Sequence, residues 1–195
     1  MSYRVYADVV KPAARIPGAV FTGALIAGFS LLLGLSAQIA IPLPFTPVPV
    51  TLQTMMVLAT GALLGSRRGA AAILLYIAEG AAGLPVFSMG RSGIAHLAGP
   101  TGGYLVGFVA AAFLAGLFSE RGWDRNGLLA FLGLMIADLA LFVPALLWLG
   151  FLTGFSTVLV LGILPFMLAD ALKAAVCASA LPLGWKMLQG PEEGR

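Results

Sequence analysis

Asp170 and Lys173 are the residues whose types and spacing most directly indicate chemistry, because both lie inside the otherwise apolar stretch 164–183. A charge placed in hydrocarbon costs about 3 kcal/mol or more, so paired ionisable residues there indicate a function. On a helix, residues three apart share a face. The pair can therefore offer one hydrogen-bond acceptor and one donor to the same small polar ligand.

The composition is that of a membrane protein. Of the 195 residues, 60% are hydrophobic and only 10% are charged, whereas soluble domains carry about 25% charged residues. The length fits a single domain, 1–195, with room for about six spans of roughly 20 residues. One cysteine excludes an intrachain disulfide, and one histidine argues against a zinc site made of protein ligands alone.

Hydropathy divides the chain into apolar runs separated by segments rich in proline, glycine and charged residues. The runs are 16–41, 51–65, 69–83, 101–118, 127–150 and 157–188. The sequence therefore predicts an all-α integral membrane protein with six transmembrane helices.

The basic residues predict the orientation of this bundle. Cytoplasmic segments of membrane proteins collect Lys and Arg, and six spans with both termini in the cytoplasm place nearly all of the 11 basic residues there. These residues are Arg4, Lys11, Arg15, Arg67, Arg68, Arg121, Arg125, Lys186 and Arg195. Only Arg91 falls on the external side, and Lys173 lies within a span. The net charge of +3 is then explained by topology rather than by nucleic-acid binding.

The two longer external connections, 41–50 and 83–100, are apolar and rich in proline and glycine. The runs that adjoin them are short, because about 15 helical residues cover only ~22 Å of a ~30 Å hydrocarbon core. Non-helical backbone at that depth is tolerated only where protein buries it or where it lines a cavity. We therefore expect both external loops to cap a ligand pocket.

Pro165 predicts the start of the last helix, because proline lacks a backbone donor and favours the first helical turn. Residues 156–164 are then a separate short segment. This start places Asp170 and Lys173 about one to two turns from the external end, at the level where Glu79 ends the third helix.

Four motifs occur in order along the chain: PFTPVPVTLQT (44–54), GLPVF (83–87), GPTGGYL (99–105) and DALK (170–173). Together they resemble the BioY family, the biotin-specific substrate-capture subunits of energy-coupling-factor transporters. The resemblance covers nearly the whole chain. It implies a prokaryotic cell-membrane subunit that binds biotin at its external side and works with a transmembrane coupling protein and two ATPase subunits.

Biotin has two N–H donors and one carbonyl acceptor in its ureido group, an apolar thioether ring and a carboxylate tail. Asp170 can accept from a ureido N–H and Lys173 can donate to the ureido oxygen, in charge-assisted bonds roughly twice as strong as neutral ones. Glu79 is a candidate acceptor for the second N–H. Arg91 is the candidate for the carboxylate, because a planar guanidinium suits it. The candidate wall residues are Thr46, Gln53, Phe87 and Tyr104.

Each candidate also has a purely structural interpretation. Asp170 and Lys173 could be an ion pair that only neutralises itself between helices. Arg91 could be solvated on its loop, and Glu79 could pair with a neighbouring helix. The aromatic and amide wall residues could serve packing alone. Outside this set, Asp138 is expected to make an interhelical hydrogen bond or to be protonated. His96 is expected to be a loop residue rather than a ligand contact.

Small residues recur at four-residue spacing in the first run, where they allow close approach of helices in lipid. In the family that the chain resembles, such positions on the first helix dock the coupling protein. This resemblance assigns the docking role to Ala24 and Gly28.

Other function classes are also considered. No G-x-x-x-x-G-K-[ST] motif occurs, so the chain is not expected to hydrolyse ATP, and the stretch GPTGG is expected to be a flexible turn. An intramembrane enzyme would use Asp138 with Asp170, or Lys173 as a base, but no nucleophile or metal-binding cluster accompanies them. A capture subunit for a different small vitamin also fits the charged pair, and only the loop motifs favour biotin.

Overall fold

Each of the six apolar runs coincides with one long helix in the structure, a computed structural model that describes residues 3–10 and 17–189. The long helices are α2 (Gly18–Gln38), α3 (Gln53–Leu64), α4 (Ser66–Ala81), α6 (Gly102–Ser119), α7 (Gly127–Thr153) and α9 (Leu164–Gln189). The basic residues Lys11, Arg15 and Arg195 lie outside the described ranges.

Short elements fill the connections between the long helices. They are α1 (Tyr6–Val9), β1 (Ala40–Ile41), β2 (Val50–Thr51), η1 (Ser88–Gly90), α5 (Ile94–Leu97), η2 (Trp123–Arg125) and α8 (Val158–Gly162). Strands β1 and β2 pair antiparallel, with Ala40 opposite Thr51. This ladder departs from the all-α expectation. Its physical reason is the proline-rich loop, which lacks the backbone donors to continue a helix and reverses the chain so that its two ends pair.

Four helical segments are long and apolar enough to cross a membrane: α2, α6, α7 and the stretch Val158–Leu188. The other two long helices are shorter, with 12 residues in α3 and 16 in α4. The sequence predicts this shortness. Helix α9 begins at Leu164, directly before Pro165, and α8 is the separate short segment that precedes it, also as predicted.

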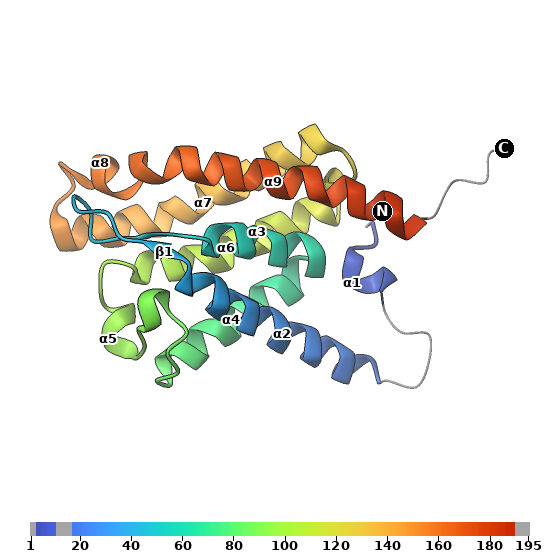
Figure 1. The fold of residues 1–195 in the computed structure, drawn as a ribbon, viewed down its shortest axis with the longest axis horizontal. Helices are drawn as coiled ribbons and strands as arrows, with labels where there is room; N and C mark the ends of the chain where they lie inside the picture. Colours follow the sequence, from blue (N-terminus) through green and yellow to red (C-terminus); the bar gives the residue numbers. More distant parts are fainter. Residues whose placement is uncertain (1–2, 11–16, 190–195) are drawn as a thin grey trace.

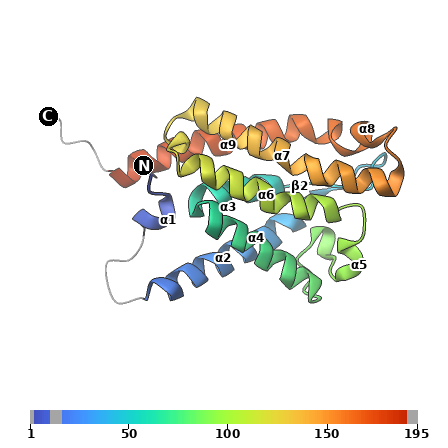
Figure 2. The same cartoon turned by 180° about the vertical axis from the view of Figure 1, so that it is seen from behind.

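Helix α6 packs against α3, α4 and α7, and α7 packs in turn against α9. Figure 2 shows α6 lying between α7 and α4. Helix α2 packs mainly on α4, and only 17% of its most apolar window is buried. The core is therefore built around α6, whereas α2 leaves a long apolar surface uncovered.

The first part of the GPTGG stretch, residues 99–101, is a turn that leads into α6, as expected, whereas its last two glycines belong to the helix. Thr101 caps α6, and Gly102 is already inside the helix. A Cβ atom at Gly102 would lie 1.8 Å from the carbonyl oxygen of Leu97. The glycine is required because α5 and the start of α6 approach too closely for any side chain.

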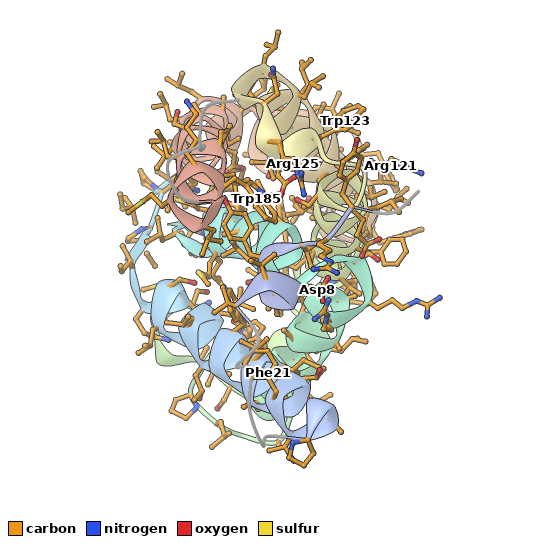
Figure 3. The ribbon with its side chains drawn as sticks, turned by 90° about the vertical axis from the view of Figure 1, so that its right-hand side faces the viewer. Asp8, Phe21, Arg121, Trp123, Arg125 and Trp185 are labelled. Carbon is orange, nitrogen blue, oxygen red and sulfur yellow. The ribbon has the colours of Figure 1, made fainter. Side chains whose placement is uncertain are left out.

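Different elements lie at the two ends of the bundle. Helix α1 and the C-terminal end of α9 lie at one end, and α5 and α8 lie at the opposite end (Figure 1). Figure 3 looks onto the α1 end, where Asp8, Arg121, Arg125 and Trp185 are seen together.

Contacts at the α1 end join segments that are distant in the sequence. The Nη2 atom of Arg68 lies 2.7 Å from Oδ1 of Asp8. The guanidinium of Arg125 lies 4.8 Å from the ring centroid of Tyr3 and 4.6 Å from that of Trp185. This end therefore gathers arginine and aromatic side chains, which are the groups that membrane proteins place at a lipid–water interface.

Candidate functional site

A cavity that is partly open to the outside lies toward the α5 and α8 end. Both loops that the sequence predicts as caps contribute to its lining, with Val48 and Pro49 from the first and Phe87 and His96 from the second. Asp170 and Lys173 line it from α9.

Aromatic side chains form the apolar part of the wall. The ring centroid of Tyr104 lies 6.2 Å from that of Phe142 and 6.0 Å from that of Phe166. The hydroxyl of Tyr104 donates to the carbonyl oxygen of Gly162 at 2.6 Å. Because this hydroxyl is already bonded, Tyr104 presents a ring face to the cavity rather than a free polar group.

Asp170 is 1% exposed, and its two carboxylate oxygens differ sharply. Oδ1 accepts from Thr54 Oγ1 at 2.7 Å and from Lys173 Nζ at 2.8 Å. Oδ2 is buried and has no hydrogen-bond partner among the described residues. Most buried polar atoms in proteins have a hydrogen-bond partner, so this oxygen is an acceptor that a donor from a ligand could satisfy.

Lys173 uses its whole donor capacity within the protein. Its Nζ donates to the carbonyl oxygen of Thr51 at 2.6 Å, to Thr54 Oγ1 at 2.9 Å and to Asp170 Oδ1 at 2.8 Å. An ammonium group has three N–H donors, so a ligand carbonyl would have to replace one of these partners. Lys173 therefore neutralises Asp170 and ties the β2–α3 segment to α9.

Gln53 belongs to a second hydrogen-bonded chain in the wall. Its side chain is 4% exposed, and Nε2 donates to the Tyr76 hydroxyl at 2.7 Å. That hydroxyl donates to the carbonyl oxygen of Val86 at 3.1 Å. Gln53 thus lines the cavity as predicted and also links the start of α3 to the loop after α4.

The structure separates three of the predicted site residues from the cavity lining. Thr46 Oγ1 donates to the carbonyl oxygen of Leu161 at 2.8 Å, which fastens the first loop to α8. Glu79 accepts from Ser30 Oγ at 2.5 Å, a contact between α4 and α2. Arg91 is exposed on the second loop. The interhelical interpretation of Glu79 and the solvated interpretation of Arg91 therefore match their surroundings.

Two further buried carboxylates lie outside this cavity lining. Asp138, in α7, is 1% exposed, and its Oδ1 has no hydrogen-bond partner in the described part of the chain. The expected interhelical bond to that oxygen is not present. Asp124, in the turn η2, accepts from Trp185 Nε1 at 2.6 Å. Burial raises the pKa of the Asp124 carboxyl, and the bond from Trp185 opposes this effect.

A sequence profile of the BioY family matches residues 12–190. The chain belongs to the BioY family.

Curated relatives in the BioY family align over most of their own length. A probable biotin transporter BioY from Pyrococcus horikoshii is 39% identical over 151 residues, which cover 77% of this chain and 88% of the relative. The biotin transporter BioY of Rhizobium etli is 38% identical over 176 residues, which cover 85% and 93%, respectively.

A solved structure has the same fold as this BioY-family chain. It is the crystal structure of the S-component for biotin from an ECF-type ABC transporter, with a TM-score of 0.78 and 25% sequence identity. The match covers 88% of this chain and 96% of that one. The likeness therefore includes the arrangement of nearly all the helices.

Sequence reasoning missed two residues that shape this BioY-family site. Thr54 bridges Asp170 and Lys173, and His96 lines the cavity from α5. Thr54 is the last residue of the PFTPVPVTLQT motif. Its hydroxyl, at the start of a short helix, could have been predicted to line the site. No comparable signal marks His96, because its contact with Phe87 depends on how the second loop folds.

Proposed function

We propose that this chain captures biotin in the cavity beside Asp170 and Lys173, as the substrate-specific subunit of an energy-coupling-factor transporter. Membership in the BioY family and the similarity to biotin transporters support a transport role over an enzymatic one. The observation that carries the proposal within the site is the buried Oδ2 of Asp170, which has no hydrogen-bond partner among the described residues although Asp170 lines the cavity.

The geometry suggests how biotin would be held. A ureido N–H would donate to Asp170 Oδ2, and the ureido oxygen would replace one acceptor of Lys173 Nζ. The rings of Phe87 and Tyr104 would contact the apolar bicycle. Gln53 would complete the wall, while the carboxylate tail would reach toward Arg91 on the second loop. Thr46 and Glu79 would then support loops and helices rather than contact the ligand.

We also propose the topology that the basic residues favour. The chain would form one domain of six membrane-crossing helices, with α3 and α4 completed by the external loops. The arginine-rich α1 end would face the cytoplasm with both termini, in accordance with the positive-inside rule. The cavity end would then face outward, across the plasma membrane of a prokaryotic cell.

Partners follow from the same proposal. A transmembrane coupling protein and two ATPase subunits would supply the energy for release. Helix α2 is the proposed docking element, because Ala24 is exposed and a Cβ atom at Gly28 would meet nothing within 4 Å.

Equilibrium binding of biotin to the purified, detergent-solubilised protein tests the central proposal. Wild-type protein is expected to bind biotin, and Asp170→Asn is expected to weaken binding by about 10- to 100-fold, because a hydrogen bond to a charged group is worth roughly 1.5–3 kcal/mol. Asp124→Asn is the matched control. It changes another buried carboxylate with one unpartnered oxygen, but at the opposite end of the bundle.

Three outcomes would count against the proposal. They are no biotin binding by folded wild-type protein, equal loss in both variants, and tighter binding of a different vitamin with an adjacent donor and acceptor pair.

A further inference from the structure

His96 lines the same cavity as Asp170, but it does so from the second external loop. Its ring stacks on Phe87, with ring centroids 5.1 Å apart and an interplanar angle of 27°. Phe87 is fully buried, so it fixes the plane of the imidazole. The His96 side chain therefore has a fixed position in the cavity wall.

The two ring nitrogens of His96 have different surroundings. Nε2 lies 3.1 Å from Thr101 Oγ1 and is engaged by that hydroxyl. Nδ1 has no hydrogen-bond partner within residues 3–10 and 17–189. An imidazolium has an N–H donor on each nitrogen. Once protonated, His96 would keep its bond to Thr101 and still have one donor for a ligand.

Both the burial of His96 and the charge near it favour its neutral form. Burial and the nearby Arg91 guanidinium lower the pKa of His96 below its ordinary value of 6.5. The other titratable groups toward this end are Tyr76 and Glu79 on α4, Tyr104 on α6, and Asp170 and Lys173 on α9. Asp170 and Lys173 pair with each other. Both tyrosine hydroxyls donate hydrogen bonds, and the Glu79 carboxylate is taken up by Ser30. An additional anion is therefore what would favour the imidazolium.

We propose that His96 binds the carboxylate tail of the ligand and takes up a proton as that anion binds. This inference rests on the proposed function, because it assigns a role at the tail end of the same ligand. Arg91 would supply a permanent charge beside the tail, and His96 a charge that forms only when the anion is present. The pair would select a free carboxylate over a neutral tail.

The direction of the pH effect follows from linkage. A carboxylate beside His96 raises the pKa of its imidazole in the complex above the value in the free protein, so the complex binds more protons. Affinity for biotin then rises as the pH falls through the pKa of the complex. It levels off below the pKa of the free protein. The amide of biotin, which has a neutral tail, lacks this dependence.

The test is the dissociation constant of biotin and of biotin amide for the whole chain in detergent, between about pH 8 and about pH 5.5. Biotin is expected to bind several-fold more tightly at the lower pH, with a ceiling of about tenfold per pH unit for one linked proton. Biotin amide is expected to give a flat profile. His96→Gln should flatten the profile for biotin, because glutamine does not titrate in this range.

The amide also separates the two proposals. Failure to bind either compound would overturn the proposed function. Binding of both compounds with the same pH profile would overturn the role of His96 and leave the function standing. A biotin profile that keeps its slope in His96→Gln would assign the proton to another group and likewise reject the inference. Circular dichroism and thermal unfolding of the variant in detergent check that it folds.

Discussion

Asp170 illustrates how a single residue can join stability to ligand binding. Its carboxylate is buried in a membrane protein, and one oxygen has no partner in the described part of the chain. Leaving a buried acceptor unpaired costs roughly 1–3 kcal/mol. In the proposed complex, a ligand N–H that donates to Oδ2 would offset that cost. The hydrogen bonds that hold Oδ1 in place would then also determine where the ligand lies.

Thr54→Val tests this arrangement at the residue scale. Valine keeps the shape of threonine but removes the hydroxyl that donates to Asp170 and accepts from Lys173. Loss of one net hydrogen bond of about 1 kcal/mol is expected to weaken biotin binding by roughly fivefold or more. Isothermal titration of the purified variant measures this change.

Thr60→Val is the matched control on the same helix. The Thr60 side chain is fully buried, but its hydroxyl bonds only to the carbonyl oxygen of Met56 within α3. Biotin affinity is expected to stay within about twofold of the wild type. An equal loss in both variants would mean that α3 responds to any lost hydroxyl, and would contradict the specific role of Thr54.

Helix α3 positions several of the side chains that line or support the cavity. It has only 12 residues, yet it packs against α2, α4, α6 and α9. Its first turn brings Gln53 and Thr54 to the cavity. Small shifts of α3 would therefore move the groups that hold Asp170 and Lys173.

Gly61→Ala tests the packing of α3 on α6. A Cβ atom at Gly61 would lie 2.1 Å from the carbonyl oxygen of Ala112, a backbone atom that cannot move aside by rotation. Forcing extra volume into a packed contact typically costs about 1–3 kcal/mol. The variant is expected to unfold at a lower temperature in detergent, and its biotin affinity should also fall.

Gly23→Ala provides the contrast, because a Cβ atom there meets nothing within 4 Å. In the interior of α2, alanine is expected to stabilise the helix by roughly 0.5–1 kcal/mol relative to glycine. Thermal unfolding of the two variants should therefore shift in opposite directions. A destabilised Gly23→Ala protein would show that α2 is more closely packed than its surroundings indicate.

Across the whole molecule, the long helices differ in how much of their apolar surface is buried by other helices. In α6, 61% of the most apolar window is buried, and in α7 44% is buried, whereas in α2 only 17% is. Lipid can cover an apolar helix, so exposure alone does not identify a partner. The combination of exposure with small residues is what makes α2 suitable for close helix docking in a membrane.

Leucine at both Ala24 and Gly28 tests the docking role. Large side chains would keep a partner helix from close approach, so biotin uptake by cells is expected to fall at least several-fold. Equilibrium binding of biotin to the purified variant should stay unchanged, because neither residue lines the cavity. Ala110→Leu, at another exposed small position on α6, should affect neither measurement. Normal uptake by a well-expressed double variant would reject the assignment.

Much of this architecture follows directly from the sequence. Hydropathy located the six long helices, because each must carry a continuous apolar stretch. Proline placed the start of α9, because its missing donor restricts it to the first helical turn. The DALK motif indicated the charged pair that lines the cavity, since ionisable residues inside an apolar helix are costly and usually serve a function.

Tertiary structure alone decided which candidates share the site. Asp170 and Lys173 are three residues apart, so local helix geometry brings them together. Thr54 lies more than a hundred residues away, and His96 reaches the cavity only through the fold of its loop. Glu79 and Thr46 have suitable chemistry but meet Ser30 and Leu161 instead. Residue type and periodicity fix what a side chain can do along its own helix, whereas packing between distant segments fixes which groups it meets.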